Sequence, residues 1–188
     1  MKKMVLLMFV IFAFIACGDG KAVPGDLPEL EWSEKAEKLP LEATELIDPD
    51  DPEKGTRIIY PATSYCEELA KNDGATEEQI KEGDKTVWHI PSIDELRTLI
   101  INCPNSEYRG ACPISEEVNQ LTYTEDWKAD KCSGCAKSNH SKFGDSGWFW
   151  SYSFGENKNT AWAINFDDAY IYGNLLGANY SVRCVRNK

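Results

Sequence analysis

Cysteines constrain this chain more than any other residue type. One, Cys17, follows an apolar N-terminal run, and six more stand at positions 66, 103, 112, 132, 135 and 184. Cys132 and Cys135 are two residues apart, with His140 close behind, a spacing that suits a zinc site, a redox pair or a structural disulfide. Which of these applies depends on the compartment in which the chain folds.

The N-terminus has the layout of an export signal. Lys2 and Lys3 precede an uncharged apolar run over residues 5–16, which is shorter than the roughly 20 residues needed to cross a bilayer. The ending Phe-Ile-Ala-Cys resembles a bacterial lipobox, where the peptidase cuts before the cysteine and the cysteine is lipid-modified. We therefore predict a signal peptide over residues 1–16 and lipidation of Cys17, for example with palmitate. The mature protein is expected in the bacterial cell envelope, lipid-anchored at the outer membrane or cell surface.

Acidic residues concentrate beside this anchor. Residues 18–54 contain twelve Asp and Glu against four Lys, and the whole chain has a net charge of −11. An acidic, proline-containing stretch of this kind usually stays solvated, so we assign residues 17–29 to a lipid anchor and acidic tether. Residues 30–188 are expected to form one domain, with 30–60 as its lead-in. The negative charge argues against a nucleic-acid partner.

The hydrophobic pattern places helices before strands. A helix is expected over residues 61–71 and another over 93–100, where Ser92 and Glu95 form a capping box. Residues 102–147 have little periodicity and are predicted to be long loops held by disulfides. Strands are expected at 30–32, 148–153, 160–166, 169–172 and 180–185, with turns at 155–157, 167–168 and 173–174. Helices followed by antiparallel strands are typical of the α+β class.

Five segments, YCEEL, WHIPSIDELRTLI, GWFWSYS, AWAINFDDAYIY and SVRCVR, follow one another along the chain. In this order they resemble the domain named after the C-terminal part of the Legionella collagen-like protein, over about Leu30 to Arg186. That family occurs in bacterial surface and secreted proteins and is related to C-type lectins and formylglycine-generating enzymes. The resemblance implies a C-type-lectin-like α+β fold, with two helices flanking a small twisted antiparallel sheet and long disulfide-stapled loops.

An even number of cysteines in an exported chain predicts three disulfides, although the sequence alone leaves fifteen pairings open. The resemblance implies that Cys66 on the first helix pairs with Cys184 on the last strand. For the other four, pairing of neighbours is the simplest arrangement, Cys103 with Cys112 and Cys132 with Cys135, and crossed pairings stay open. Zinc binding by these cysteines, or by three of them with His140, is the less favoured alternative, as is a redox-active pair. No metal or cofactor is expected.

The sequence favours binding over catalysis. His89 and His140 are the only histidines, and His89 is interpreted as a structural hydrogen-bonding residue. Asp94 and Glu95 are explained by their place at a helix start. From residue 147 onward, aromatic and amide side chains alternate along the expected strands, and Trp162, Ile164 and Phe166 share a face that we assign to the core.

The remaining rings and amides would form a surface suited to an extracellular glycan or protein, since Tyr and Trp give large contacts at low entropic cost. The candidate contact residues are Trp150, Tyr152, Asn157, Asn159, Asp168, Tyr170, Tyr172, Asn174, Asn179 and Tyr180. We therefore expect a non-enzymatic, adhesin-like surface lipoprotein. The alternatives are an enzyme of the formylglycine-generating type and a structural envelope lipoprotein without a soluble ligand.

Overall fold

The computed structural model describes residues 27–46, 50–51, 53, 55–115, 131–155 and 158–188. In these residues the helices are α1 (Pro61–Asn72), α2 (Glu77–Glu82) and α3 (Ile93–Arg97). The strands are β1 (Leu30–Trp32), β2 (Ala36–Leu39), β3 (Ala43–Leu46), β4 (Thr56–Ile59), β5 (Trp148–Phe154), β6 (Thr160–Asn165), β7 (Tyr170–Leu175), β8 (Tyr180–Val182) and β9 (Val185–Asn187). The predicted α+β class is compatible with this content.

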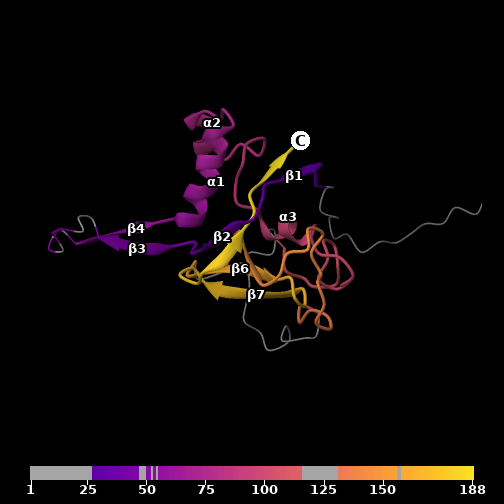
Figure 1. Ribbon diagram of the computed structural model, residues 1–188. Helices are drawn as coiled ribbons and strands as arrows, with labels where there is room; N and C mark the ends of the chain where they lie inside the picture. Colours follow the sequence, from indigo (N-terminus) through magenta and orange to yellow (C-terminus); the bar gives the residue numbers. More distant parts are fainter. Residues whose placement is uncertain (1–26, 47–49, 52, 54, 116–130, 156–157) are drawn as a thin grey trace, which may run out of the picture.

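A five-stranded sheet in the order β2-β8-β5-β6-β7 forms the centre of the fold (Figure 1). Strands β5, β6 and β7 form an antiparallel meander, and β2 pairs antiparallel with β8. The pair β5 and β8 is parallel, with Phe149 opposite Ser181. The prediction of a purely antiparallel sheet is therefore wrong: after β7 the chain returns across two strands and lies beside β5 instead of pairing with β7.

Each face of the sheet packs against a different helix. Phe149 lies in one buried cluster with Leu96 of α3, and its neighbour Trp150 lies in another with Ala62 of α1. Successive residues of a strand point to opposite faces, so the two clusters occupy the two faces of the sheet. Trp162, Ile164 and Phe166, assigned to the core from the sequence, are at most 3 % exposed, which confirms that assignment.

The predicted helices form, but the second is shorter than expected. Helix α1 begins with proline in its first turn and ends before Gly74, close to the predicted bounds. Helix α3 begins at the predicted capping box and ends at Arg97 instead of continuing to residue 100. Ile100 forms a β-bridge with Ser141, and this pairing draws the chain out of the helix while Ile100 stays buried.

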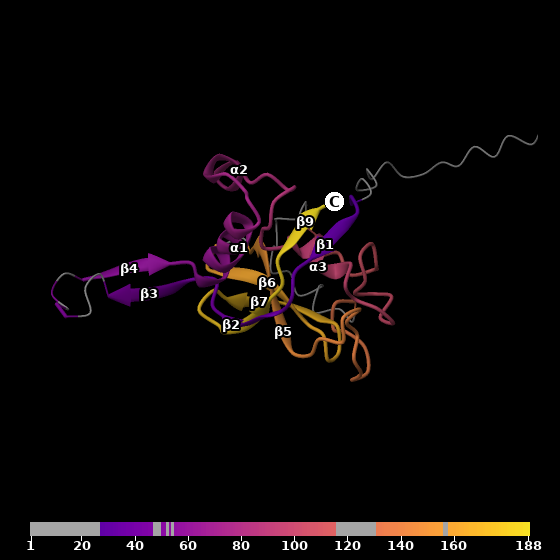
Figure 2. The ribbon, with the colours of Figure 1, turned by 45° about the horizontal axis from the view of Figure 1, so that its top comes forward.

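The expected C-terminal strand is divided into β8 and β9 at Arg183 and Cys184. Ser33 holds this point: its N–H donates to the Cys184 carbonyl at 2.9 Å, and its hydroxyl accepts from the Cys184 N–H at 2.9 Å. Beyond the break, β9 pairs with β1 in a separate two-stranded sheet. The predicted first strand is therefore confirmed, and it lies beside the C-terminus (Figures 1 and 2).

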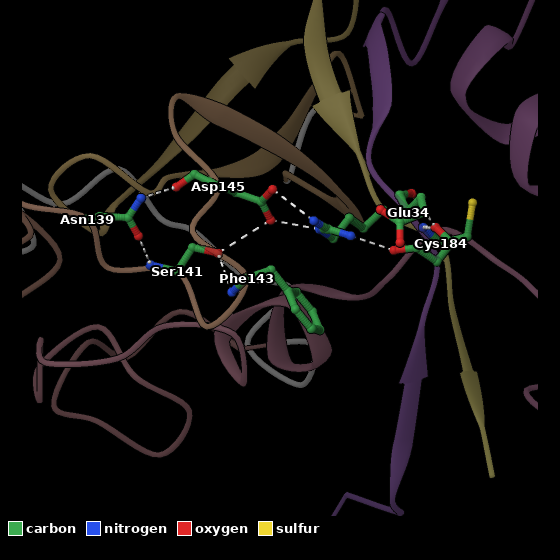
Figure 3. A network of polar contacts seen from close by, with 8 residues as sticks. Glu34, Asn139, Ser141, Phe143, Asp145 and Cys184 are labelled. Carbon is green, nitrogen blue, oxygen red and sulfur yellow. Dashed lines mark hydrogen bonds and ion pairs between the residues drawn. The ribbon is translucent and has the colours of Figure 1, made fainter.

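Arg183 ties this break to a distant loop. Its guanidinium donates two hydrogen bonds to the Asp145 carboxylate, at 2.7 and 2.9 Å, and a third to the Ser33 carbonyl (Figure 3). Both side chains are at least nine-tenths buried. A bidentate, buried pair of this kind fixes geometry, because leaving either charge unpaired would be costly.

The lead-in contains more structure than its composition suggests. Strands β3 and β4 form a two-stranded ribbon that projects from the body on the side away from β1 (Figures 1 and 2). A cross-strand ion pair joins Glu45 and Arg57 at 3.0 Å, and Ile58 on the same ribbon is 57 % exposed. Its base is held by the Leu41 N–H, which donates to the Leu176 carbonyl.

Three disulfides are present, as the cysteine count predicts, and one has the pairing implied by the resemblance. Cys66 on α1 is bonded to Cys184, with 5.6 Å between their Cα atoms. The other two are Cys103–Cys135 and Cys112–Cys132, nested one inside the other, so the expected pairing of neighbours is wrong.

Hydrogen bonds to the β6–β7 hairpin explain why Cys132 and Cys135 do not pair with each other. The Cys135 N–H donates to the Asp168 carbonyl at 2.6 Å, and the Ile171 N–H donates to the Cys132 carbonyl at 3.1 Å. Between them, a Cβ on Gly134 would lie 2.2 Å from the Asp168 carbonyl oxygen. Residues 132–135 therefore lie along the β6–β7 hairpin. Cys132 is bonded to Cys112, and Cys135 is bonded to Cys103.

Gly173 and Asn174 were expected to form a turn, but both lie inside β7. Gly173 is paired with Trp162 of β6, and a Cβ on it would contact the indole ring at 3.7 Å. The glycine therefore packs beside a large ring, a common role for glycine within a strand. By contrast, Asp167 and Asp168 do form the predicted turn between β6 and β7.

Candidate ligand-binding surface

Four aromatic rings and one amide gather on the α1 face of the sheet, toward β7. We call Trp148, Tyr170, Tyr172, Tyr180 and Asn174 the aromatic surface. Tyr170, Tyr172 and Asn174 are alternate residues of β7 and therefore share one face. Asn165 of β6 pairs with both Tyr170 and Trp148, which brings these two rings onto neighbouring positions. Tyr180 comes from β8, so three strands of the central sheet contribute to one face.

The rings contact one another in an unbroken series. Tyr172 stacks on Tyr170 with 5.6 Å between ring centroids, and Tyr170 meets Trp148 edge-on at 6.0 Å. Trp148 in turn stacks on Tyr180 at 5.5 Å. Neighbouring aromatic rings at these separations stabilise one another, so the surface is largely preformed before a ligand arrives.

Small residues make room for this arrangement. Ala161 and Ala163 of β6 lie on the same face and are fully buried, and Tyr180 packs against their cluster. The Tyr180 hydroxyl reaches Asn174 on the edge strand β7 and donates to its Oδ1 at 3.0 Å. Burial raises the pKa of Tyr180 above its ordinary value of 10.0, so the hydroxyl keeps its proton for this bond.

Trp150 was predicted to contact ligand, and this prediction is wrong. Trp150 lies on the same face as Trp148 but is fully buried, with 0 % of its surface exposed. Its indole N–H donates to the carbonyls of Leu39 and Ala178 at 3.1 and 3.3 Å. Chain segments beside β2 and β8 therefore cover this ring and leave Trp148 partly open. Trp148, absent from the predicted contacts, lies two positions before Trp150 on β5, so strand alternation places it on the same face.

The other predicted contact residues divide into two groups. Tyr170, Tyr172, Asn174 and Tyr180 belong to the aromatic surface. Tyr152 is 50 % exposed and lies outside the aromatic surface, with its ring 4.8 Å from that of Phe154. Strand β5 is irregular after Trp150, and the Tyr152 N–H donates to the Pro91 carbonyl instead of to a neighbouring strand.

The predicted loop residues have local roles or lie outside the described residues. Asp168 accepts the Tyr170 N–H at 3.2 Å with its own side chain, and its backbone carbonyl holds the 132–135 segment, so it serves the hairpin. Asn159 accepts the Leu176 N–H with its backbone carbonyl, and Asn179 is exposed beside β8. Asn157 lies outside the described residues.

Both histidines have structural partners. His89 Nδ1 lies 2.9 Å from the Val87 carbonyl, and its Nε2 lies 3.3 Å from Glu95 Oε1. His140 is buried, with its two ring nitrogens 2.9 and 3.1 Å from the carbonyls of Ile101 and Ala136. The interpretation of His89 as a hydrogen-bonding residue is confirmed. His140 therefore connects the loop after Cys135 to the segment that follows α3.

Glu95 combines a capping role with an ionic one. Its carboxylate accepts the Ser92 N–H at 2.7 Å, which confirms the predicted capping box. Burial alone would raise the pKa of this carboxyl, but the hydrogen bond from His89, the positive charge of Lys85 and the Ser92 N–H together lower it below its ordinary value of 4.5. The site therefore holds a carboxylate ion, in a role that helix capping explains.

Two further features bear on the kind of site. In the described part of the chain, no three His, Cys, Asp or Glu side chains come together as a possible metal site. None of the helices formed by the described residues has the length and apolar character needed to cross a bilayer.

The fold and this surface define a disulfide-stapled α+β domain with a preformed cluster of partly exposed rings. The chain belongs to the Lcl C-terminal domain family, whose model matches residues 22–186, which confirms the predicted resemblance. No curated protein and no solved structure matches the chain.

Proposed function

We propose that the protein is a bacterial cell-envelope lipoprotein, anchored through Cys17, whose C-type-lectin-like domain binds an extracellular glycan without catalysing a reaction. The observation that carries the binding role is the aromatic surface. Its partly exposed rings, of which Tyr172 is the most open at 40 %, are joined to an amide, so the surface offers flat apolar area and hydrogen-bonding groups together. The faces and hydroxyls of a sugar require both.

The charge of the surface favours a neutral ligand. Its five members carry no ionised group, and the pKa of Tyr180 is raised, so they offer neither anion nor cation at neutral pH. The chain as a whole has 31 acidic and 20 basic residues, which disfavours polyanions at any site without local cations. A neutral glycan therefore fits the aromatic surface better than a charged one.

The cysteines support a binding role over the formylglycine-generating alternative. That chemistry needs a reactive cysteine beside a substrate cleft, whereas all six cysteines after residue 60 are joined in disulfides that tie loops and termini together. Cys66, Cys103 and Cys184 are at most 1 % exposed. A buried, bonded sulfur is not available as a nucleophile.

A glycan array probed with the labelled protein, followed by titration of the best neutral oligosaccharide, tests the proposal. Tyr172→Ala removes the most exposed ring of the aromatic surface and should weaken binding at least fivefold, the effect of losing more than about 1 kcal/mol at one contact. Tyr152→Ala is the matched control, because this ring is 50 % exposed, against 40 % for Tyr172, but lies outside the aromatic surface. Both variants should unfold at the same temperature as the parent within a few degrees.

The other functions make different predictions for the same experiment. A protein ligand would leave the glycan array blank and still lose affinity in Tyr172→Ala. A purely structural envelope protein would leave glycan and protein arrays blank alike. Intact mass measurement of the membrane-extracted protein tests the anchor separately, since acylation should be lost in Cys17→Ala.

A further inference from the structure

A surface depression lies beside β1, on the side of the molecule away from the β3–β4 ribbon (Figure 1). We call it the N-terminal groove; its volume is about 450 Å³. An adjoining depression of about 480 Å³ shares Thr98, Tyr108 and Lys142 with it. The groove is lined by Leu27, Pro28, Leu30, Trp32, Thr98, Leu99, Tyr108, Arg109, Lys142 and Phe143.

The charge of the groove is opposite to that of the chain. Its lining holds two cations, Arg109 and Lys142, and no Asp or Glu, although acidic residues outnumber basic ones in the sequence by 31 to 20. The nearest acids in β1 and before it are already engaged, since Glu31 pairs with Arg186 at 2.9 Å and Glu29 pairs with Lys188. An anion entering the groove therefore meets two cations and no carboxylate in the lining itself. Glu107, which lines the adjoining depression, accepts the Cys103 N–H at 3.1 Å.

The walls are aromatic and held in place. Phe143 is 51 % exposed, yet its ring lies over the buried Arg183 guanidinium, 4.6 Å away, and its N–H donates to the Ser141 hydroxyl (Figure 3). Ser141 in turn donates to the Asp145 carboxylate at 3.3 Å. The network in Figure 3 therefore holds the exposed Phe143 ring in one position, through its contacts with Arg183 and Ser141.

The opposite rim is equally fixed. Arg97 donates to the backbone carbonyls of Ser106, Glu107 and Ile114, and the two nested disulfides begin at either end of this loop. Arg109 has a φ of +64°, uncommon for a residue with a side chain, and its guanidinium lies 5.3 Å from the Tyr108 ring centroid. Backbone strain of this kind is found where surrounding structure holds a functional conformation.

We propose that the N-terminal groove binds the anionic headgroup of a phospholipid in the membrane that anchors the chain. The inference rests on the lipoprotein part of the proposed function. Leu27 follows Cys17 by ten residues, which span at most about 36 Å when fully extended, so the groove stays within reach of the bilayer surface. Tethering gives the headgroups a high effective concentration, so a weak site is sufficient.

The chemistry of the lining matches that surface. Lys142 and Arg109 supply charge-assisted hydrogen bonds to a phosphate, while Trp32, Tyr108 and Phe143 contact the glycerol and upper acyl region. Trp and Tyr are the residues enriched at this depth of a bilayer. Docking here would also direct the β3–β4 ribbon, on the other side of the molecule, away from the membrane (Figure 2).

The lipid-anchored protein, purified in nanodiscs of phosphatidylcholine with or without phosphatidylglycerol, tests the proposal by lysine acetylation and mass spectrometry. Lys142 should react about fivefold more slowly when phosphatidylglycerol is present, the factor expected for one cation at an anionic surface. Lys81, exposed on α2, is the internal control and should react at the same rate in both. Equal rates for Lys142 in both discs would overturn the proposal.

A pair of double variants separates the groove from general charge. Hydrogen exchange over residues 106–110 should slow in phosphatidylglycerol discs for the parent and for K38Q/K81Q, but not for R109Q/K142Q. Protection of Lys142 by soluble glycerol phosphate in phosphatidylcholine discs would assign the groove to a free phosphate ligand and contradict docking to the membrane.

The two proposals fail separately. If intact mass shows no acyl group on Cys17, the anchor is wrong, and co-sedimentation of the unlipidated chain with phosphatidylglycerol vesicles then tests the groove directly. Binding that K38Q/K81Q retains and R109Q/K142Q loses would support the groove without the anchor. Absence of any co-sedimentation would refute it.

Discussion

Removing the Cys66–Cys184 disulfide should strongly destabilise the domain without changing any residue of the aromatic surface. The bond joins residues 118 positions apart, whereas Cys112–Cys132 spans 20. In the chain-entropy model, closing these loops in the unfolded state is worth about 5 and about 3 kcal/mol. Since a domain of this size has a total stability of about 5–15 kcal/mol, C66A/C184A should lose at least about a third of it.

Urea unfolding followed by tryptophan fluorescence, without reductant, measures both losses on the same scale. C66A/C184A should lose about 2 kcal/mol more free energy of unfolding than C112A/C132A. The matched pair controls for the substitution itself, because each variant removes two buried sulfurs. An equal loss, or a larger loss in C112A/C132A, would refute the reasoning from loop length and indicate that local packing of the loops dominates.

Three further changes test the framework of the domain. Arg183→Met leaves the Asp145 carboxylate buried without its bidentate partner, so the free energy of unfolding measured in urea should fall by about 3–5 kcal/mol. Because the pKa of Glu95 is lowered on folding, its ionised form stabilises the protein above pH 4.5 and that contribution is lost as the pH falls below; Glu95→Gln should flatten this acid limb in thermal unfolding. Gly134→Ala places a Cβ 2.2 Å from the Asp168 carbonyl oxygen at a φ of +79°, so its melting temperature should drop by several degrees, whereas an unchanged value would contradict the close approach.

The regular elements were predictable where a local signal exists. The helix at 61–71 has an apolar face and a proline at its start, and the capping box at Ser92 and Glu95 fixes where α3 begins. The end of α3 was not predictable, because it depends on a bridge between Ile100 and Ser141. A pairing between residues 41 positions apart leaves no mark on the local pattern that suggested a longer helix.

Strands β3 and β4 show the converse failure. The lead-in around them is acidic and contains prolines, so composition predicts a solvated segment. The ribbon partly is one, since Thr44, Glu45 and three of the four β4 residues are exposed. The strands form because a ribbon needs only cross-strand hydrogen bonds and pairs such as Glu45 with Arg57, and neither requires an apolar face. Hydrophobic periodicity therefore cannot detect them.

The sequence predicted four members of the aromatic surface but included Trp150 and missed Trp148, and both of these residues lie on β5. Trp148 and Trp150 are two positions apart on the same face of β5, so alternation assigns them the same environment. The backbone around Leu39 and Ala178 covers Trp150 and accepts its N–H, whereas Trp148 stays partly exposed among the residues that the structure describes. Because that cover comes from segments 111 and 28 residues away, exposure along β5 is set by tertiary structure. Two residues apart on one strand, Trp150 therefore belongs to the core and Trp148 to the candidate contact surface. Tyr180 contacts both rings and so connects the core to that surface.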